Sequence, residues 1–332
     1  MQRKAIITGG AGFIGSHLVD RLLAEGGWHV VVLDNFHPNY PRHIKEANLA
    51  PHRSDPRFRL VEGDILDDLA LDRAFAAAGG PAIVVHMAGL VGVRPSMADP
   101  GGYHQVNVTG TLRVLVKAKE NRCPHFMLAS SSSVYGNNPE LPWSEHQKAD
   151  PISPYGATKL IAEEFTRNFD HIMGLPSTVL RFFTVYGPRQ RPDLAIHKFF
   201  DHISKGSPIS RYGDGTTSRD YTYVADIIAG VRAAMDLAVE QRKADECCPV
   251  YNLGHSEPVE LRALIAAIEA QAGRKAGLEV LPEQPGDMRR TYANINKARA
   301  ALGFRPTTTL ADGLRQFARW YEQTTLAAEV RK

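Results

Sequence analysis

The sequence is short of cysteine and of long apolar runs. Cys123 and the adjacent pair Cys247 and Cys248 are its only cysteines, and they make neither a disulfide framework nor a Cys-x-x-Cys metal motif. No apolar run approaches the roughly 18 residues that a membrane helix needs. The first residues, MQRKAIITGG, enter a strand-like run without a signal-peptide segment. We therefore expect free thiols, no membrane association and a cytoplasmic location.

A strong excess of one charge is also absent. Lys and Arg number 39 and Asp and Glu number 36, so the net charge is +3, and the basic residues are dispersed along the chain. Nucleic-acid-binding proteins concentrate basic residues on one face, so we expect no nucleic-acid partner. The chain has 332 residues, of which 43% are hydrophobic and 23% charged. That length and composition suit a globular protein with one large domain, or one large and one small domain.

The first half of the chain alternates short β-branched runs with helix-length amphipathic segments. We predict strands at 4–8, 29–34, 58–62, 82–88 and 125–131, and helices at 13–25, 66–78 and 106–120. The strand runs are continuously apolar, as in parallel strands buried on both faces. The alternation predicts an α/β fold with a Rossmann-like, doubly wound parallel sheet.

Past residue 182 the alternation loosens into turn clusters such as 211–220 and 281–290. We therefore predict two domains. Residues 1–181 form the dinucleotide-binding domain, and residues 182–332 mainly form a smaller α/β substrate domain, with some segments returning to the first. The ligand is expected in the crevice between the two domains.

A glycine-rich turn links the first predicted strand to the first helix. Gly9, Gly12 and Gly15 are spaced three apart, which departs from the usual GxGxxG pattern. Glycine lets backbone N–H groups approach a pyrophosphate at a helix N-terminus. Asp34 ends the second strand 19 residues after Gly15. An acid there suits the ribose hydroxyls of NAD and would repel the extra phosphate of NADP, so we predict NAD as the cofactor.

Tyr155 and Lys159 are four residues apart and share one face of a predicted helix. A free tyrosine titrates near about 10, too high for a general base at neutral pH. A nearby ammonium would lower that pKa. A bare Tyr-x-x-x-Lys pair also occurs on protein surfaces, but here four serines, residues 130–133, end a predicted strand shortly before it. A serine at that place can hydrogen-bond a sugar hydroxyl while the tyrosine removes its proton.

The chain carries a set of motifs in one order: TGGAGFIG, LDNF, EGDI, HMAG, SSSSVYG, YGATK, RFFTVYGPR and GDGTTSRDYTYVAD. In this combination it resembles the extended short-chain dehydrogenase/reductases that modify nucleotide sugars, over nearly its whole length. The resemblance implies an NAD site of Gly9, Gly12, Phe13, Ile14, Gly15, Asp34, Asn35, Asp64, Ile65, Ala88, Gly89, Asn107, Tyr155, Lys159 and Phe183. It further implies Tyr155 as the base, Lys159 on the nicotinamide ribose, and Ser131 as the catalytic serine. Ser132 and Ser133 are close enough to leave the serine open.

The reaction follows from what stands beside the catalytic serine. Dehydratases of this group carry an acid pair where this chain has Ser132 and Ser133, and decarboxylases usually carry a Glu nearby that is missing here. The remaining reaction is 4-epimerisation. Tyr155 would remove the O4 proton as hydride leaves C4, and the 4-keto sugar would rotate and take the hydride back on its other face.

The segment RFFTVYGPRQRPD, residues 181–193, looks like that of UDP-glucuronate 4-epimerases, as does GVRPSM at 92–97. Phe183 and Thr184 match family positions beside the nicotinamide and the sugar. Arg191 and Arg94 are candidate carboxylate or anion contacts, because a planar guanidinium can grip a carboxylate with two hydrogen bonds. Arg189 serves the diphosphate or a helix cap as readily as a carboxylate.

The expected substrate is a UDP-hexuronic acid, UDP-glucuronate. Its candidate contacts are Arg94, Ser133, Thr184, Arg191, Tyr212, Arg219, Asp287 and Arg290. By resemblance, Tyr212 stacks on uracil and Arg219 contacts the diphosphate. The relatives' extra arginine before Asp287 is replaced by Gln284, which weakens the assignments at 284–290.

Two alternatives stay open. The first is a UDP-glucose/UDP-galactose 4-epimerase, which uses the same machinery on a hydroxymethyl sugar. The second is a protein that binds NAD without turnover and acts as a sensor or scaffold, against which the intact Ser131, Tyr155 and Lys159 argue. Relatives often pair through the helices that hold residues 106–120 and 155–170, so we expect a homodimer.

Overall fold

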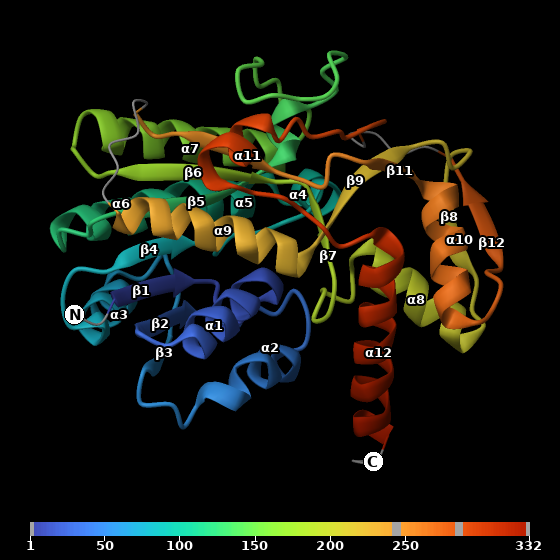
Figure 1. Ribbon diagram of the computed structural model, residues 1–332, viewed down its shortest axis with the longest axis horizontal. Helices are drawn as coiled ribbons and strands as arrows, with labels where there is room; N and C mark the ends of the chain where they lie inside the picture. The colour runs from blue at the N-terminus through green and yellow to red at the C-terminus, as the bar shows by residue number, and fades with distance from the viewer. Residues whose placement is uncertain (1–2, 241–246, 283–287, 330–332) are drawn as a thin grey trace.

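The computed structural model describes residues 3–240, 247–282 and 288–329, and a seven-stranded parallel sheet lies at its centre (Figure 1). The strands lie in the order β10–β6–β5–β4–β1–β2–β3, so the winding reverses between β1 and β4. Their bounds are β1 Arg3–Thr8, β2 Trp28–Asp34, β3 Phe58–Glu62, β4 Ile83–His86, β5 Phe126–Ser131, β6 Ser177–Phe182 and β10 Val250–Leu253. The predicted doubly wound fold is confirmed, and its ligand site is expected beyond the carboxyl ends of the strands at that reversal.

Successive residues of β1 and β2 belong to separate hydrophobic clusters on the two faces of the sheet. Ile7 and Val32 lie in one cluster, and Ile6 and Val31 lie in the other. All four side chains are at most 1% exposed. Strand side chains alternate between faces, so a continuous apolar run is what burial on both faces requires. Each such side chain contributes about 1.5–3 kcal/mol of transfer free energy.

Helices cover both faces of the sheet. α3, α6 and α7 pack on one face, and α1 and α9 pack on the other, with α11 beside α9 (Figure 1). The bounds are α1 Phe13–Glu25, α2 Arg42–Leu49, η1 Ala50–His52, α3 Asp68–Ala78, α6 Thr111–Glu120, η3 Ser132–Tyr135, α7 Pro154–His171, α9 Val224–Val239 and α11 Asn296–Leu302. Three short pieces run into α6: α4 Val93–Ala98, α5 Pro100–His104 and the π-helical η2 Gln105–Gly110.

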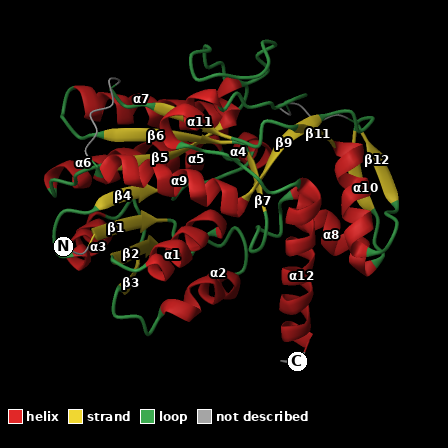
Figure 2. Ribbon diagram, in the orientation of Figure 1, coloured by secondary structure: helices red, strands yellow, loops and turns green. Residues whose placement is uncertain are grey.

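A second region lies beyond the carboxyl ends of the strands (Figure 2). It contains a three-stranded sheet, a parallel strand pair and three helices. The bounds are β7 Thr184–Tyr186, β9 Ser218–Tyr223, β11 Pro258–Glu260, β8 Ile209–Tyr212, β12 Leu278–Leu281, α8 Ala195–Lys205, α10 Leu261–Ala272 and α12 Leu310–Glu329. Although α9 and β10 also follow residue 182, they pack with the central sheet.

Two buried aspartates hold the loops of the second region in place. Asp220 on β9 accepts hydrogen bonds from the backbone N–H groups of residues 255, 256 and 293, at 2.7–3.0 Å. Asp226 on α9 accepts from the N–H groups of Thr307 and Thr308, at 3.2 and 3.1 Å. A buried carboxylate with several backbone donors is well compensated for its lost hydration. The Asp220 bonds fix the strand that supplies Arg219 to the cavity wall.

The predicted element bounds agree closely with the structure for α1 and β3, and differ around α6. The predicted helix at 106–120 is preceded by α5, and its first five residues belong to the π-helical turn η2. In that turn the Asn107 side chain is turned inward and bonds the backbone of Leu90. Apolar periodicity records which face is buried, but it does not record a locally widened turn.

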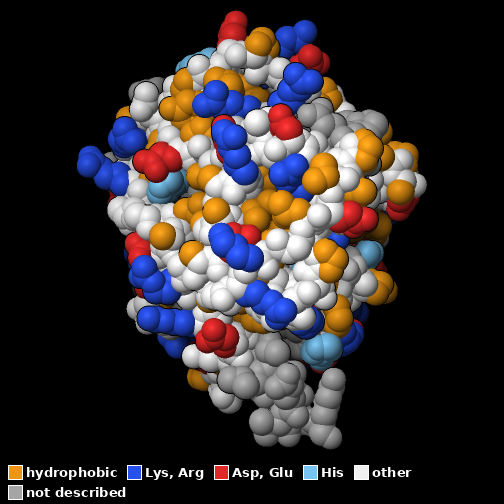
Figure 3. Space-filling model, turned by 90° about the vertical axis from the view of Figure 1, so that its right-hand side faces the viewer, with side chains coloured by type: hydrophobic (Ala, Val, Ile, Leu, Met, Phe, Trp, Pro, Cys, Tyr) orange, Lys and Arg blue, Asp and Glu red, His pale blue; other side chains and the backbone are white. Residues whose placement is uncertain are grey.

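Several features of the described residues concern the expected absence of membrane, metal, disulfide and nucleic-acid interactions. No helix within the described ranges is both long and apolar enough to cross a membrane, and no group of three or more His, Cys, Asp and Glu side chains there is arranged to hold a metal. All three cysteines are free thiols. The outer face of the second region shows Lys and Arg side chains scattered among hydrophobic ones (Figure 3).

Candidate active site

A cavity of about 400 Å³ opens between the carboxyl ends of the central strands and the second region. Its walls come from the segments that follow β1, β2, β3, β4, β5 and β6, and from α7, β7 and β9. Residues from the two halves of the chain therefore face one another across it. The predicted site residues that line the cavity are Gly9, Gly12, Phe13, Ile14, Gly15, Asp34, Asn35, Asp64, Ile65, Ala88, Gly89, Ser131, Ser132, Ser133, Tyr155, Lys159, Phe183, Thr184, Arg191 and Arg219.

The glycine-rich turn leaves room that any larger residue would fill. Gly9 has a φ of 70°, and a Cβ atom there would lie 2.7 Å from the backbone nitrogen of Ala88. A Cβ on Gly15 would lie 2.5 Å from the carbonyl oxygen of Gly9. The first turn of α1 contains no acidic residue, so its N–H groups and its dipole face the cavity without an internal anion. This cradle fits a dinucleotide pyrophosphate.

Asp34 ends β2 with both carboxylate oxygens fixed. Oδ2 accepts the N–H of Ala11 at 2.9 Å and Oδ1 accepts the N–H of Phe36 at 2.8 Å. Burial raises the pKa of Asp34, and these two backbone bonds oppose the shift. Beside it, Asn35 Nδ2 donates to Asp64 Oδ2 at 2.7 Å. Each Asp34 oxygen keeps a lone pair for a ribose hydroxyl, so this end of the cavity fits the adenosine of NAD.

Lys45 is a wall residue that the sequence reasoning missed. Its side chain on α2 is buried, donates to the carbonyl of His37 at 2.6 Å and to Asn39 Oδ1 at 3.0 Å, and lies 4.4 Å from the centre of the Tyr40 ring. Burial lowers its pKa, and the charge of Asp34 opposes that shift. The signal was the spacing of Lys45, Asn48 and Leu49, which places a lysine on the buried face of a short helix.

Tyr155 and Lys159 project from the first turns of α7 into the cavity. The helix begins where Ser153 accepts the N–H of Gly156 at 3.1 Å and Pro154 occupies the first position. Burial raises the pKa of Tyr155, whereas its hydrogen bond with Ser131 and the charge of Arg191 lower it. In the chain without a cofactor, Ser131 and Arg191 are the groups that lower this pKa, and the expected effect of Lys159 together with bound NAD stays a prediction.

The serine run places one hydroxyl beside the phenol. Ser131 ends β5, hydrogen-bonds Tyr155, and accepts the N–H of Ser133 at 3.2 Å. Its hydroxyl also donates to Ser133 Oγ at 3.2 Å. Ser132 and Ser133 line the cavity as the first residues of η3. Among the three serines left open by the sequence, Ser131 is the one in contact with Tyr155.

Asn107 does not line the cavity but braces the segment that does. Its Oδ1 accepts the N–H of Leu90 at 2.8 Å, and its Nδ2 donates to the Leu90 carbonyl at 3.0 Å and to Thr158 Oγ1 at 3.1 Å. Leu90 follows Gly89 in the cavity wall, and Thr158 donates to the carbonyl of Tyr155 at 2.9 Å. Asn107 thus ties the wall after β4 to the catalytic helix.

His86 continues this buried support. Its Nδ1 lies 2.7 Å from Thr8 Oγ1, and its Nε2 lies 3.0 Å from Thr111 Oγ1. The Thr111 hydroxyl donates to the carbonyl of Asn107, so it accepts from Nε2–H and leaves Nδ1 to accept from Thr8. Burial and the charge of Lys159 lower the pKa of His86 to about 3. A neutral imidazole therefore joins the ends of β1 and β4 to α6.

The two arginines of the segment after β7 have different surroundings. Arg191 lines the cavity, and its Nε and Nη2 bind both oxygens of Asp193 at 3.0 and 2.6 Å. Arg189 turns toward α1, where Nη1 lies 2.8 Å from Asp20 Oδ2 and donates to Ser16 Oγ at 3.3 Å. Only Arg191 of this pair is placed to meet a ligand in the cavity.

The remaining predicted substrate residues are Arg94, Tyr212, Arg219, Asp287 and Arg290. The Arg94 guanidinium lies 4.0 Å from the centre of the Tyr212 ring, and neither residue lines the cavity. Arg290 lies outside it as well, 5.8 Å from the centre of the Tyr292 ring. Arg219 does line it. Asp287 lies outside the described residues. The expected stacking of a base on Tyr212 therefore meets a ring whose face already holds Arg94.

Comparison with known proteins gives consistent matches over nearly the whole chain. Residues 6–317 match the protein family described as GDP-mannose 4,6 dehydratase. The sequence is 38% identical over 333 residues to a probable UDP-glucuronate 4-epimerase of Rhizobium meliloti, with 96% of this chain and 97% of that relative covered.

Two solved structures show the same architecture. One is the UDP-glucuronic acid 4-epimerase of Bacillus cereus in complex with UDP-glucuronic acid and NAD, with a TM-score of 0.88, 35% identity, and 97% and 99% of the two chains covered. The other is the UDP-glucose 4-epimerase of Thermotoga maritima with UDP-glucose, with a TM-score of 0.86, 30% identity and the same coverage.

Proposed function

This chain belongs to the GDP-mannose 4,6 dehydratase family of extended short-chain dehydrogenase/reductases, and from that premise we propose that it is an NAD-dependent UDP-glucuronate 4-epimerase. The observation that carries the proposal is one cavity in which a Ser131–Tyr155 hydrogen bond faces an arginine, Arg191. The first pair suits proton transfer at a sugar hydroxyl, and the arginine suits a carboxylate. The relatives named for this activity cover nearly the whole chain.

The cofactor is NAD, and the residues that we assign to it line the cavity. The glycine cradle would take the pyrophosphate, Asp34 the adenosine ribose, and Lys159 the nicotinamide ribose. Bound NAD supplies a hydride acceptor and donor. Burial of Asp34 and Lys159 keeps water from competing for these contacts.

The chain's own contribution to the reaction is proton transfer and orientation. Tyr155 takes the proton of the C4 hydroxyl as the sugar is oxidised to its 4-keto form, while Ser131 holds the same oxygen by a hydrogen bond. After the sugar turns over in the cavity and its C4 is reduced from the opposite face, Tyr155 returns the proton to O4. Epimerisation therefore needs no further acid or base beyond this pair.

The cavity does not offer the groups that related dehydratases need. Among the described residues that line it, the only carboxylates are Asp34 and Asp64, and both lie at the adenosine end. The sugar end has Ser132 and Ser133 where an acid pair would have to stand. Elimination of water requires a proton donor and a base beside C5 and C6. Without these groups, a 4-keto sugar formed here would be reduced again at C4, which gives epimerisation.

The uronate proposal assigns Arg191 to the substrate carboxylate, with Ser133 and Thr184 beside the sugar and Arg219 on the diphosphate. A 4-keto uronate is a β-keto acid and loses carbon dioxide readily, so a firm grip on its carboxylate protects it. Arg191 binds the Asp193 carboxylate through two of its nitrogens, which supports its assignment to a substrate carboxylate.

The same contact favours a second candidate, UDP-glucose/UDP-galactose 4-epimerisation. If Asp193 keeps Arg191 neutralised, the cavity meets a hydroxymethyl group more readily than a carboxylate. The structural likeness to a UDP-glucose 4-epimerase is nearly as close as that to the uronate enzyme. Which anion holds Arg191 therefore separates the two functions.

The same proposal covers the roles of the two domains, the oligomeric state and the cellular location of the protein. Residues 1–181 would carry NAD, and residues 182–332 would mainly carry the nucleotide sugar.

A homodimer would form through α6 and α7, which lie side by side and expose Val116 (38%) and Ile161 (40%). The three free thiols suit the cytoplasm. Light scattering of V116E/I161E should show a monomer if that interface is correct.

The deciding experiment incubates the purified protein with UDP-glucuronate and, separately, with UDP-glucose, and resolves the products by anion-exchange chromatography. UDP-galacturonate from the first and little conversion of the second support the proposal. Turnover of UDP-glucose alone establishes the second candidate, and a UDP-pentose would show that the keto acid loses carbon dioxide. No turnover, with no sugar-dependent absorbance of reduced nicotinamide, would identify an NAD-binding protein without catalysis.

A further inference from the structure

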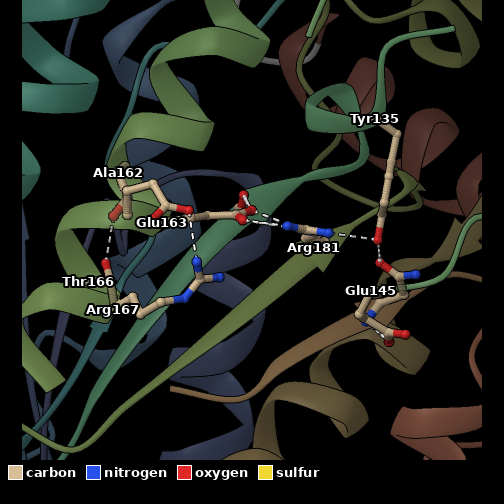
Figure 4. A network of polar contacts seen from close by, with 10 residues as sticks. Tyr135, Glu145, Ala162, Glu163, Thr166, Arg167 and Arg181 are labelled. Carbon is tan, nitrogen blue, oxygen red and sulfur yellow. Dashed lines mark hydrogen bonds and ion pairs between the residues drawn. The ribbon is translucent and has the colours of Figure 1, made fainter. Parts of the chain in front are cut away.

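A fully buried carboxylate lies one helical turn after Lys159 on α7. Glu163 has no exposed side-chain surface, and its oxygens accept from Arg181 Nε at 3.0 Å and Nη2 at 2.6 Å. Ser130 also donates to it. Figure 4 shows Glu163 reaching from α7 to Arg181 on β6, with Tyr135 on the far side of the guanidinium. Nothing in the proton transfer described above uses this carboxylate.

The bonds of Glu163 reach every element that carries a catalytic side chain. Ser130 immediately precedes Ser131 at the end of β5, and Tyr155 and Lys159 are on the same helix as Glu163. Beyond Arg181, Nη1 donates to the Tyr135 hydroxyl at 2.9 Å, and that hydroxyl donates to Asn252 Oδ1 at 2.7 Å. A shift of Glu163 would therefore move β5 and α7 relative to each other.

The buried groups around Lys159 carry more positive than negative charge when no ligand is bound. The titratable groups around Lys159 are Tyr155 and Glu163 on α7, His86 on β4, and Arg181 on β6 behind Glu163. Within this set Lys159 and Arg181 are cations and Glu163 is the anion, because His86 and Tyr155 are neutral at pH 7 in the described chain. The next acid, Glu145, lies beyond Arg181, near the Tyr135 hydroxyl (Figure 4). Burial lowers the pKa of Lys159 to about 8, and the negative charge of Glu163 opposes that shift.

We propose that Glu163 is a positioning residue that supplies the buried counter-charge of Lys159. Arg181 and Ser130 hold its carboxylate in place, and residues 159 and 163 are separated by one turn, so their side chains share a helix face. The residue touches neither substrate nor cofactor and acts through Lys159. An ammonium in a desolvated site needs such a partner to stay protonated near neutral pH. Its loss would leave Lys159 unable to hold the nicotinamide ribose in mildly alkaline solution.

The role deepens the proposed function, on which it rests, but its test does not need turnover. The dissociation constant of NAD is measured by calorimetry from pH 6 to pH 10 for the wild type, E163Q, and E163Q/R181M. The pH–kcat/KM profile with UDP-glucuronate is recorded in parallel. E164Q is the matched control, because Glu164 is the next residue of α7, lies on the surface, and pairs with Arg167 at 2.9 Å.

We expect the alkaline loss of NAD affinity to begin about one pH unit or more lower in E163Q than in the wild type. In E163Q/R181M, which removes the orphaned guanidinium as well, the shift should be smaller but in the same direction, and E164Q should match the wild type. The double variant also guards against misfolding, because replacing both partners of a buried pair is often tolerated where removing one is not.

An alkaline limb at the wild-type pH in both Glu163 variants, with only a lower Tm, would overturn the proposal and leave Glu163 with a structural role. Failure of the proposed function is distinguishable, because NAD binding would then follow the predicted pH shifts while UDP-glucuronate remained unconverted.

Discussion

The floor of the cleft and its rim hold their side chains in different ways. On the floor, Asp34, Ser131, Tyr155 and Lys159 are each less than one-tenth exposed. They lie at strand ends or in the first turns of α7, and backbone or buried polar partners fix them. The rim consists of Arg94, Arg191, Tyr212, Arg219 and Arg290, whose side chains are half-buried or exposed.

Several rim side chains are held by contacts with other side chains. Arg94 from α4 rests on Tyr212 from β8, and Arg191 is paired with Asp193 two residues further along the chain. Such contacts between long side chains in partial contact with water contribute little and are readily exchanged. The difference indicates that the floor determines the chemistry, which tolerates no displacement, and the rim determines which nucleotide sugar enters.

The largest effect should come from the floor residue that moves the proton. Y155F should lower kcat by about 10³-fold, because general acid–base catalysis contributes about 10²–10⁴-fold. NAD affinity should be unchanged, since the ring remains in place. Y103F is the control: Tyr103 packs edge-on against Tyr155, with ring centroids 6.2 Å apart, but its hydroxyl donates to the Val91 carbonyl. Activity of Y155F near the wild-type level would show that another group takes the proton.

At the rim, R191M should lower kcat/KM for UDP-glucuronate by about 10- to 100-fold, the range of a charge-assisted contact of about 1.5–3 kcal/mol. Turnover of UDP-glucose, if present, should be little changed. R189M from the same segment is the matched control, because Arg189 serves Asp20 and Ser16 on α1. Equal losses in both variants would mean that the segment, and not the Arg191 charge, is what the substrate needs.

The contrast between floor and rim also explains which parts of the site could be predicted from the sequence. The floor could be predicted, because α1 and β3 follow from apolar periodicity, and the glycine turn, Asp34 and the serine run stand at the strand ends that such a sheet brings together. Lys45 was missed because a buried lysine looks like a surface residue until its helix face is considered. The Arg94–Tyr212 stack could not be predicted, since the distance between two residues more than a hundred positions apart depends on how the second region packs.

Acid should lower the stability of the protein, because His86 is buried as a neutral imidazole. His86 has a folded-state pKa of about 3, below its ordinary value, so its contribution to stability is fully present above about pH 6.5. That contribution is lost as the pH falls toward the folded-state pKa, because the unfolded chain takes up a proton that the folded chain refuses. The free energy of unfolding should fall by about 1.4 kcal/mol per pH unit from this residue.

Urea titrations between pH 7 and pH 5 test this dependence. His125, whose pKa burial lowers to about 4, adds to the slope of the wild type. H86Q keeps a hydrogen-bond donor and an acceptor but cannot be protonated. In this variant the pH dependence of the unfolding free energy should lose the part that comes from one proton. H43Q, at an exposed position of α2, is the matched control. A slope in H86Q equal to that of the wild type would mean that His86 is protonated in the folded protein.

The smallest effect, and the one whose sign is most informative, concerns the stack at the rim. A nucleobase that uses the Tyr212 face must displace Arg94, whose guanidinium lies 4.0 Å from the ring centre. A cation–π contact at an exposed site contributes about 0.5–1 kcal/mol, so R94M should lower KM for the UDP-sugar by about two- to fivefold. Y212L should raise KM and should abolish the effect of R94M in the double variant, because both changes act through one ring. A KM that rises in R94M, with or without Tyr212, would place Arg94 on the ligand, as its sequence motif suggested. In that case the rim residues, like the floor residues, would contact the ligand directly. The rim and the floor would then differ only in how deeply their side chains are buried.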